Sequence, residues 1–149
     1  MVVVLSGVDP VLLATAAAYV DALHRECSLA RIDAAQGAAL GASSARLAEL
    51  AVDLVPHLEQ IADWYRAAER REGGDGSVVL RGPLDASMAL ELDQGIAELL
   101  EVDELGRRGG LLVEEGPAVV GFVAWAWAEA AAQLRGAAPT AYPGGGVAP

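Results

Sequence analysis

Apolar residues recur at helical spacing in four segments of the chain, and this repetition limits the fold more than any other feature. The first stripe is Leu13, Ala16, Ala17, Val20, Leu23 and Cys27. The second stripe is Leu47, Leu50, Leu54, Leu58, Ile61 and Tyr65, with Trp64 beside it. Spacings of three and four residues place each stripe on one face of an α-helix, so each segment must bury that face against another element.

The third and fourth segments are separated by a glycine break. The third stripe is Met88, Leu92, Ile96 and Leu99. Gly109-Gly110 can take the positive φ that ends a helix, and Pro117 suits the first turn of the next helix, which Gly136 ends. Four such segments within 149 residues predict a mainly α fold, a four-helix bundle that forms a single helical domain over residues 1–136.

Local signals predict where the first two helices begin and end. Asp9 can cap the first helix and Pro10 supplies its fixed φ, and we expect this helix to reach Glu26 or Cys27. Residues 28–42 are interpreted as a loop, with a helical turn around 32–40 as an alternative. Pro56 falls inside the second stripe, where it removes a helical hydrogen bond, so we expect a kink or a split near 52–55.

A few segments lack helical periodicity. Residues 2–5 fit a short strand or a packed arm, and residues 66–76 fit a charged helix end followed by a flexible turn. Ser77 to Arg81 is the candidate for a short two-stranded β ribbon with Leu111 to Val113, held against the bundle. The Pro- and Gly-rich residues 137–149 are predicted to form a flexible tail.

Charge and composition exclude some classes of function. The chain has 10 basic residues against 21 acidic ones, a net charge of −11, which argues against direct binding of nucleic acid. No apolar run approaches the ~20 residues that a membrane span requires. The single cysteine, Cys27, fits a reducing compartment, so we expect a cytoplasmic protein without a membrane segment.

Candidate reactive groups are few. His24 and Cys27 lie three residues apart on one helix and could bind a metal or act as base and nucleophile, although a structural role is the simpler interpretation. His57 follows Pro56 and could act as a pH-sensitive group at a kink, or be an ordinary polar residue. Acidic pairs flank the glycine break, at 103–104 and 114–115, where they fit a solvated face. The sequence therefore predicts no enzyme, no cofactor and no metal site.

Trp125 and Trp127 lie two residues apart, so they project about 200° from each other on a helix. One extends the apolar stripe of Val120 and Val123, and the other lies with Phe122 on a different face. A helix that is apolar on two faces is either buried centrally or contacts something beyond its own bundle. Both interpretations remain open from the sequence.

The C-terminal half carries a distinctive set of residues: Glu98 to Leu105, Arg108 to Leu112, Pro117, Val119, Val120, Phe122, Trp125, Glu129, Gln133 to Gly136 and Pro139. With these residues the chain, over residues 10–142, resembles a family of small helical modules of actinobacterial signalling proteins. These modules often accompany anti-sigma-type (serine-kinase-like) ATP-binding domains. The Asn-bearing helix and glycine boxes of the ATP-binding domain are absent from this sequence.

The resemblance implies a non-catalytic regulatory module that acts through protein–protein contact in bacterial stress or sigma-factor signalling. Its partner would be a protein such as an anti-sigma-type regulator, and a homodimer is compatible with the same role. The residues expected to contact a partner are Phe122, Trp125, Glu129, Gln133, Arg107 and Arg108. The alternative is a helical sensor that binds an apolar or aromatic small molecule in the bundle core, where small alanines beside Trp64, Tyr65, Trp125 and Trp127 would leave a pocket.

Overall fold

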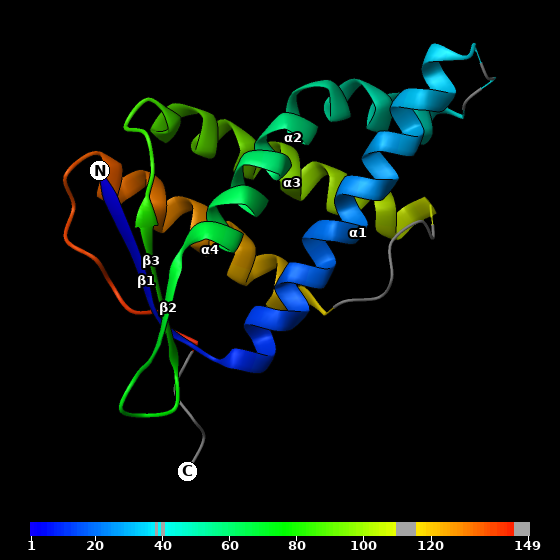
Figure 1. Ribbon diagram of the computed structural model, residues 1–149. Coiled ribbons are helices and arrows are strands. Elements are labelled where there is room, and N and C mark those ends of the chain that lie inside the picture. Colours follow the sequence, from blue (N-terminus) through cyan, green and yellow to red (C-terminus); the bar gives the residue numbers. More distant parts are fainter. Residues whose placement is uncertain (38, 40, 110–115, 145–149) are drawn as a thin grey trace.

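The computed structural model describes residues 1–37, 39, 41–109 and 116–144. Its elements in chain order are β1 (Val2–Val8), α1 (Pro10–Ala35), α2 (Ala42–Ala67), β2 (Glu69–Glu72), β3 (Val78–Pro83), α3 (Met88–Gly109) and α4 (Pro117–Leu134). Figure 1 shows the small sheet at one end of the helices, while the adjoining ends of α1 and α2 project at the other end.

The four helices confirm the predicted mainly α bundle. α1 contacts α2, α2 contacts α3, α3 contacts α4, and α4 contacts α1, so the helices enclose a shared core. The predicted stripes face this core: Leu23 and Cys27 of α1, Leu54 of α2 and Leu99 of α3 are completely buried. Periodic burial of apolar faces is therefore what holds the bundle together.

The start of α1 was predicted correctly and its end was not. The Asp9 side chain accepts hydrogen bonds from the backbone N–H groups of Val11 and Leu12, at 2.8 and 3.0 Å. The helix then continues to Ala35 instead of ending near Cys27. Residues 28–35 contain no Gly or Pro and are rich in good helix formers, so nothing local stops the helix before Gly37, whose φ is +72°.

α2 runs without a break through Pro56, so the predicted split does not occur. A proline removes only one helical hydrogen bond, and the buried residues Leu54, Val55 and Leu58 hold both sides of the position in the core. Packing on each side thus outweighs the local cost, and Figure 1 shows the helix changing direction along its length.

The sheet has three antiparallel strands in the order β1-β3-β2. β3 corresponds to the predicted strand at Ser77 to Arg81, but its partners differ from the prediction. β1 pairs with one edge of β3 and β2 with the other. The predicted partner, Leu111–Val113, lies outside the described residues. β2 was interpreted as a helix end; it becomes a strand because a tight turn at 73–77 folds it back onto β3.

The C-terminal segment, residues 137–144, meets the outer edge of β1 at Ala141 and Tyr142. The Tyr142 N–H donates to the Ser6 carbonyl at 2.9 Å, and Ser6 forms a parallel bridge with Ala141. Gly7 permits this approach, because its φ is +72° and a Cβ there would lie 3.1 Å from the Ala141 Cβ. The edge of β1 is thus covered along part of its length, and the flexibility predicted for 137–149 stays a prediction.

Candidate functional site

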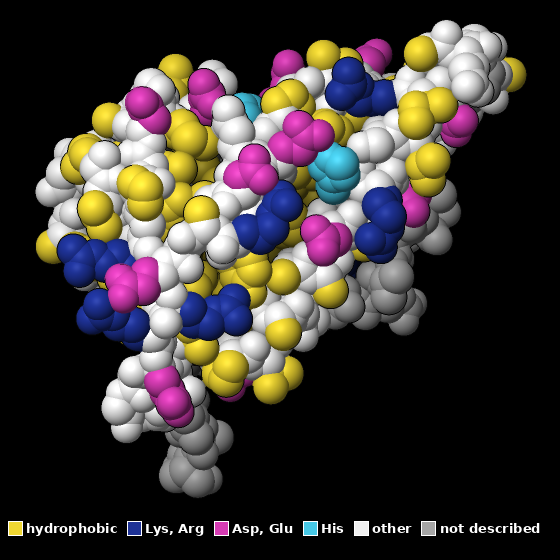
Figure 2. Space-filling model, viewed as in Figure 1, with side chains coloured by type: hydrophobic (Ala, Val, Ile, Leu, Met, Phe, Trp, Pro, Cys, Tyr) yellow, Lys and Arg dark blue, Asp and Glu magenta, His cyan; other side chains and the backbone are white. Residues whose placement is uncertain are grey.

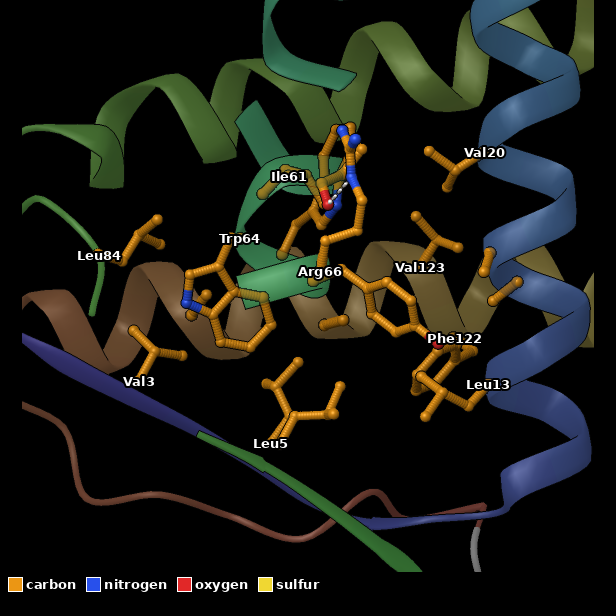
Figure 3. Close-up of a pocket in the computed structure, with 18 of the residues that line it drawn as sticks. Val3, Leu5, Leu13, Val20, Ile61, Trp64, Arg66, Leu84, Phe122 and Val123 are labelled. Carbon is orange, nitrogen blue, oxygen red and sulfur yellow. Dashed lines mark hydrogen bonds between the residues drawn. The ribbon is translucent and has the colours of Figure 1, made fainter. Parts of the chain in front are cut away.

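An apolar cavity of about 370 Å³ lies between α1, the second half of α2, α4 and the sheet. Figure 3 shows Leu13 and Val20 of α1 facing Trp64 of α2 across this space, with Val3 and Leu5 of β1 along its floor. The lining residues are Val3, Leu5, Leu13, Ala16, Ala17, Val20, Asp21, Ile61, Ala62, Trp64, Tyr65, Arg66, Leu80, Leu84, Phe122, Val123, Ala126, Trp127 and Ala130.

The cavity exists because small residues face one another from three helices. These are Ala16 and Ala17 of α1, Ala62 of α2, and Ala126 and Ala130 of α4. The first two belong to the stripe that predicted the inner face of α1. Large neighbours hold the helix backbones apart, and methyl side chains do not fill the space between them.

The cavity is closed at the sheet and open at the surface. Its deep wall includes Leu5, Leu80 and Trp127, all buried, with Trp127 only 2% exposed. Its mouth lies between α1 and the end of α2, where Val20 and Tyr65 are half-buried. Figure 2 shows hydrophobic side chains at the bottom of a recess that charged side chains surround.

Two charged side chains line the cavity, Asp21 on α1 and Arg66 on α2, and both are exposed. Arg66 is engaged: its Nε donates to the Ala62 carbonyl at 3.1 Å and its Nη2 to Asp63 Oδ1 at 2.6 Å. Nearby, the Arg70 guanidinium donates to the Tyr65 hydroxyl at 2.5 Å and lies over the Tyr65 ring, 5.2 Å from its centre. Polar groups are therefore confined to the mouth.

Trp64 forms one wall of the cavity because a glycine lets it approach the sheet. A Cβ on Gly82 would lie 2.9 Å from the indole Nε1, so only glycine fits there without displacing the ring. The Nε1–H is buried and has no hydrogen-bond partner among the described residues. The indole edge that faces Gly82 is thus sealed from water, which leaves the apolar part of the ring to line the cavity.

A polar network on α4 joins the helix to β1 and to the C-terminal segment. The Gln133 side-chain amide accepts from the Val4 N–H at 2.9 Å and donates to the Val4 carbonyl at 2.7 Å, which completes the outer edge of β1. Glu129 accepts from Gln133 Nε2, and from the Thr140 N–H and hydroxyl. Burial opposes ionisation of Glu129, but these hydrogen bonds outweigh it and lower its pKa.

An aromatic cluster connects the C-terminal segment to the cavity wall. The Phe122 ring lies 6.0 Å from that of Trp125, and Tyr142 meets both rings edge-on at 5.2 and 5.0 Å. Phe122 is buried and also lines the cavity, whereas Trp125 is half-buried. Of the two tryptophans, Trp127 is therefore part of the core, as the central-burial interpretation requires. Trp125 lies at the edge of the core, where it remains partly exposed.

The residues predicted to contact a partner form two separate groups. Phe122, Glu129 and Gln133 are buried within the chain, and Trp125 is half-buried beside them. The other group lies at the end of α3, where Arg107 bonds Asp103 at 2.7 Å and Arg108 bonds Glu104 at 2.9 Å. Four of the six residues, Glu129, Gln133, Arg107 and Arg108, thus already have hydrogen-bond or ion-pair partners inside the fold. Whether a second protein contacts any of the six stays a prediction.

The histidine and cysteine candidates are separated. His24 Nε2 lies 3.1 Å from Glu59 Oε1, while Cys27 is fully buried, and this burial raises the pKa of its thiol to about 11. A thiol in this environment is a packing group and not a nucleophile. Within the described part of the chain, no group of three or more His, Cys, Asp or Glu residues is arranged to hold a metal ion.

The other titratable candidates serve contacts between helices. His57 Nε2 lies 3.7 Å from Glu91, and its Nδ1 is buried. Asp103, one of the predicted surface acids, accepts from the buried Tyr19 hydroxyl at 2.8 Å. Burial and this hydrogen bond raise the pKa of Tyr19. Sequence reasoning missed Tyr19 because it falls beside the apolar stripe; its ring is buried and its hydroxyl reaches Asp103 of α3.

Comparison of the chain with protein-family models, curated proteins and solved structures finds no match. Within the described residues, no helix has both the length and the apolar character needed to cross a membrane. The cavity and the surfaces of the chain itself are therefore what indicate its function.

Proposed function

We propose that this protein binds an apolar or aromatic small molecule in its cavity and acts as a sensor of it. The observation that carries the proposal is about 370 Å³ of unfilled volume with walls made almost entirely of aliphatic and aromatic side chains. Protein interiors are normally close-packed, so a core seldom leaves such a space. Ligand pockets, in contrast, are typically concave, mainly apolar and ~300–1,000 Å³ in volume.

Two tryptophans supply a direct signal for binding. Trp64 and Trp127 line the cavity from α2 and α4, so a bound molecule would contact both rings. Trp125 does not line it and reports on the neighbouring aromatic cluster. Titration with the apolar fluorescent probe N-phenyl-1-naphthylamine is expected to quench tryptophan emission and to increase probe emission, and the increase should saturate.

Filling the cavity from α1 should abolish most of this binding. In an Ala17→Phe variant, the ring would occupy volume that a ligand needs, and we expect the probe to bind about tenfold more weakly or worse. The half-buried position of Ala17 gives the new ring room to adjust at the mouth. The measurement is the dissociation constant from the same fluorescence titration.

Ala18→Phe is the matched control, because Ala18 lies next in the chain but is exposed and outside the cavity. It adds the same apolar ring to the same helix without entering the cavity. If both variants bind the probe as well as the parent chain, the probe is on the surface and the proposal fails. Circular dichroism checks that both variants retain their helices.

A second function, regulation through protein–protein contact, is favoured by the aromatic cluster at Trp125. This side chain is half-buried on α4, next to Tyr142, and offers part of an indole to a partner. The resemblance to actinobacterial signalling modules supports the same role, with a cytoplasmic anti-sigma-type regulator or a second copy of the chain as partner. The two functions are compatible, since Phe122 contacts both Trp125 and the cavity.

Light scattering tests the simplest form of this second function, a homodimer. If Trp125 lies in the interface, Trp125→Ala should weaken association about tenfold or more, as removal of a central aromatic residue commonly does. Leu100→Ala is the control, because Leu100 is a 49%-exposed apolar residue on α3. A chain that is monomeric at all concentrations, or equal association by both variants, would contradict a Trp125 dimer.

A further inference from the structure

The charges at the mouth indicate which ligands the cavity would select, provided that the proposed function holds. We propose that the cavity binds amphipathic amines, with the apolar part inside and the ammonium group at the Asp21 carboxylate. The first step is the position of Asp21, the only carboxylate among the lining residues, on α1 at the exposed end of the cavity.

Among the described residues, the charge of Arg66 is already paired, whereas the charge of Asp21 is not. Arg66 donates to Asp63 in an ion pair at 2.6 Å. Asp21 has no hydrogen bond or ion pair with any described residue, and Arg25, one helical turn further along α1, forms none with it. The mouth therefore presents one unneutralised carboxylate and one neutralised guanidinium, which favours a cationic group over an anionic one.

The remaining cation near the mouth is directed elsewhere. Arg70 donates to the Tyr65 hydroxyl and its guanidinium lies over the Tyr65 ring, so it contacts the outer side of the cavity wall and is not a lining residue. At longer range the net charge of −11 attracts cations and repels anions. The nearby Asp21 carboxylate and the net negative charge of the whole chain thus both favour a cationic ligand.

The interior determines how such a ligand must lie. Beyond Asp21 and Arg66, the walls are aliphatic and aromatic, and an ammonium group inside them would be an unpaired buried charge. At the mouth it stays hydrated and meets Asp21. A ligand with one apolar end and one ammonium end therefore has a single favourable orientation.

Three compounds with the same ten-carbon chain separate the contribution of head-group charge to affinity from that of apolar burial. They are decylamine, 1-decanol and decanoic acid, each used below its micelle concentration at pH 7. Their affinities are measured by displacement of N-phenyl-1-naphthylamine. Since exposed ion pairs contribute modestly, we expect decylamine to bind about two- to fivefold more tightly than 1-decanol, and decanoate to bind most weakly.

Asp21→Asn should remove most of the preference for decylamine over 1-decanol and leave only the small part that the net charge of the chain supplies. Asp33→Asn is the control, since Asp33 is an exposed residue of the same helix outside the cavity and its change alters net charge equally. A preference for the amine that Asp21→Asn reduces no more than Asp33→Asn does, or a preference for decanoate, would overturn the assignment to amines and leave the cavity as a binding site. If none of the three compounds displaces the probe, the proposed function itself fails.

Discussion

Replacing Glu129 with alanine should lower the free energy of unfolding by about 2–4 kcal/mol, because hydrogen bonds to a buried charged group are among the stronger ones. Glu129 is only 8% exposed and accepts from Gln133 Nε2, at 2.8 Å, and from both the N–H and the hydroxyl of Thr140. Without it, the Thr140 N–H and one Gln133 contact lose their acceptor. The measurement is urea unfolding, followed by circular dichroism.

The loss should depend on pH in a defined direction. The pKa of Glu129 in the folded protein lies below the ordinary value of 4.5, so folding favours its ionised form. Its contribution to stability is therefore fully present above about pH 4.5 and declines as pH falls through the lowered pKa. The difference between parent and Glu129→Ala should narrow in acid, and a difference that is constant down to pH 3 would contradict this account.

Glu104→Ala is the matched control for Glu129→Ala. Glu104 is an exposed glutamate of α3 whose ion pair with Arg108 spans one helical turn. Exposed pairs of this kind contribute about 0.5 kcal/mol or less. If the two alanine variants were destabilised equally, Glu129 would not be the anchor of the C-terminal segment. Loss of that anchor should also change the fluorescence of Trp125, because Tyr142 packs against its ring.

Gly95→Ala should destabilise the protein by about 1–3 kcal/mol, although helix propensity alone predicts a gain of ~1 kcal/mol. Gly95 lies inside α3, where a Cβ would come within 2.9 Å of Trp127 Cζ3. The Trp127 ring is buried at 2% exposure, so the new methyl group must push it out of its packed position. The measurement is again the free energy of unfolding in urea.

Gly121→Ala provides a control that should have the opposite sign. Gly121 also lies inside a helix, α4, but a Cβ there meets nothing within 4 Å. Only the propensity term remains, and we expect stabilisation of about 0.5–1 kcal/mol. A stabilised Gly95→Ala variant would mean that α3 and α4 do not approach each other as closely as the structure places them.

The helix starts could be predicted from sequence because their causes are local. Asp9 caps α1 within three residues of itself, and Pro117 fits the first turn of α4. The helix end at Ala35 and the strand Glu69–Glu72 were missed. α1 continues to Ala35 because the chain has no helix-ending residue before Gly37. Residues Glu69–Glu72 form a strand only because β3 lies beside them.

The candidate site was predicted only in part. The alternative of a pocket beside small alanines named Trp64, Tyr65 and Trp127, which line the cavity, and Trp125, which lies outside it. The position of Asp21 at the cavity was not visible from the sequence, since a charged residue next to an apolar stripe normally faces solvent. Glu129 was expected to contact a partner protein, which stays a prediction; the sequence did not show that it is buried with partners from residues 133 and 140.

The sequence by itself determined four amphipathic helices and the face that each one buries, because helical periodicity and capping act over a few neighbouring residues. Only the tertiary structure decided that the buried faces leave a cavity, that β3 lies between β1 and β2, and that Glu129 anchors the C-terminal segment. These features depend on distances between residues far apart in the chain. Such distances are set when all the helices pack together at once, and no local pattern records them.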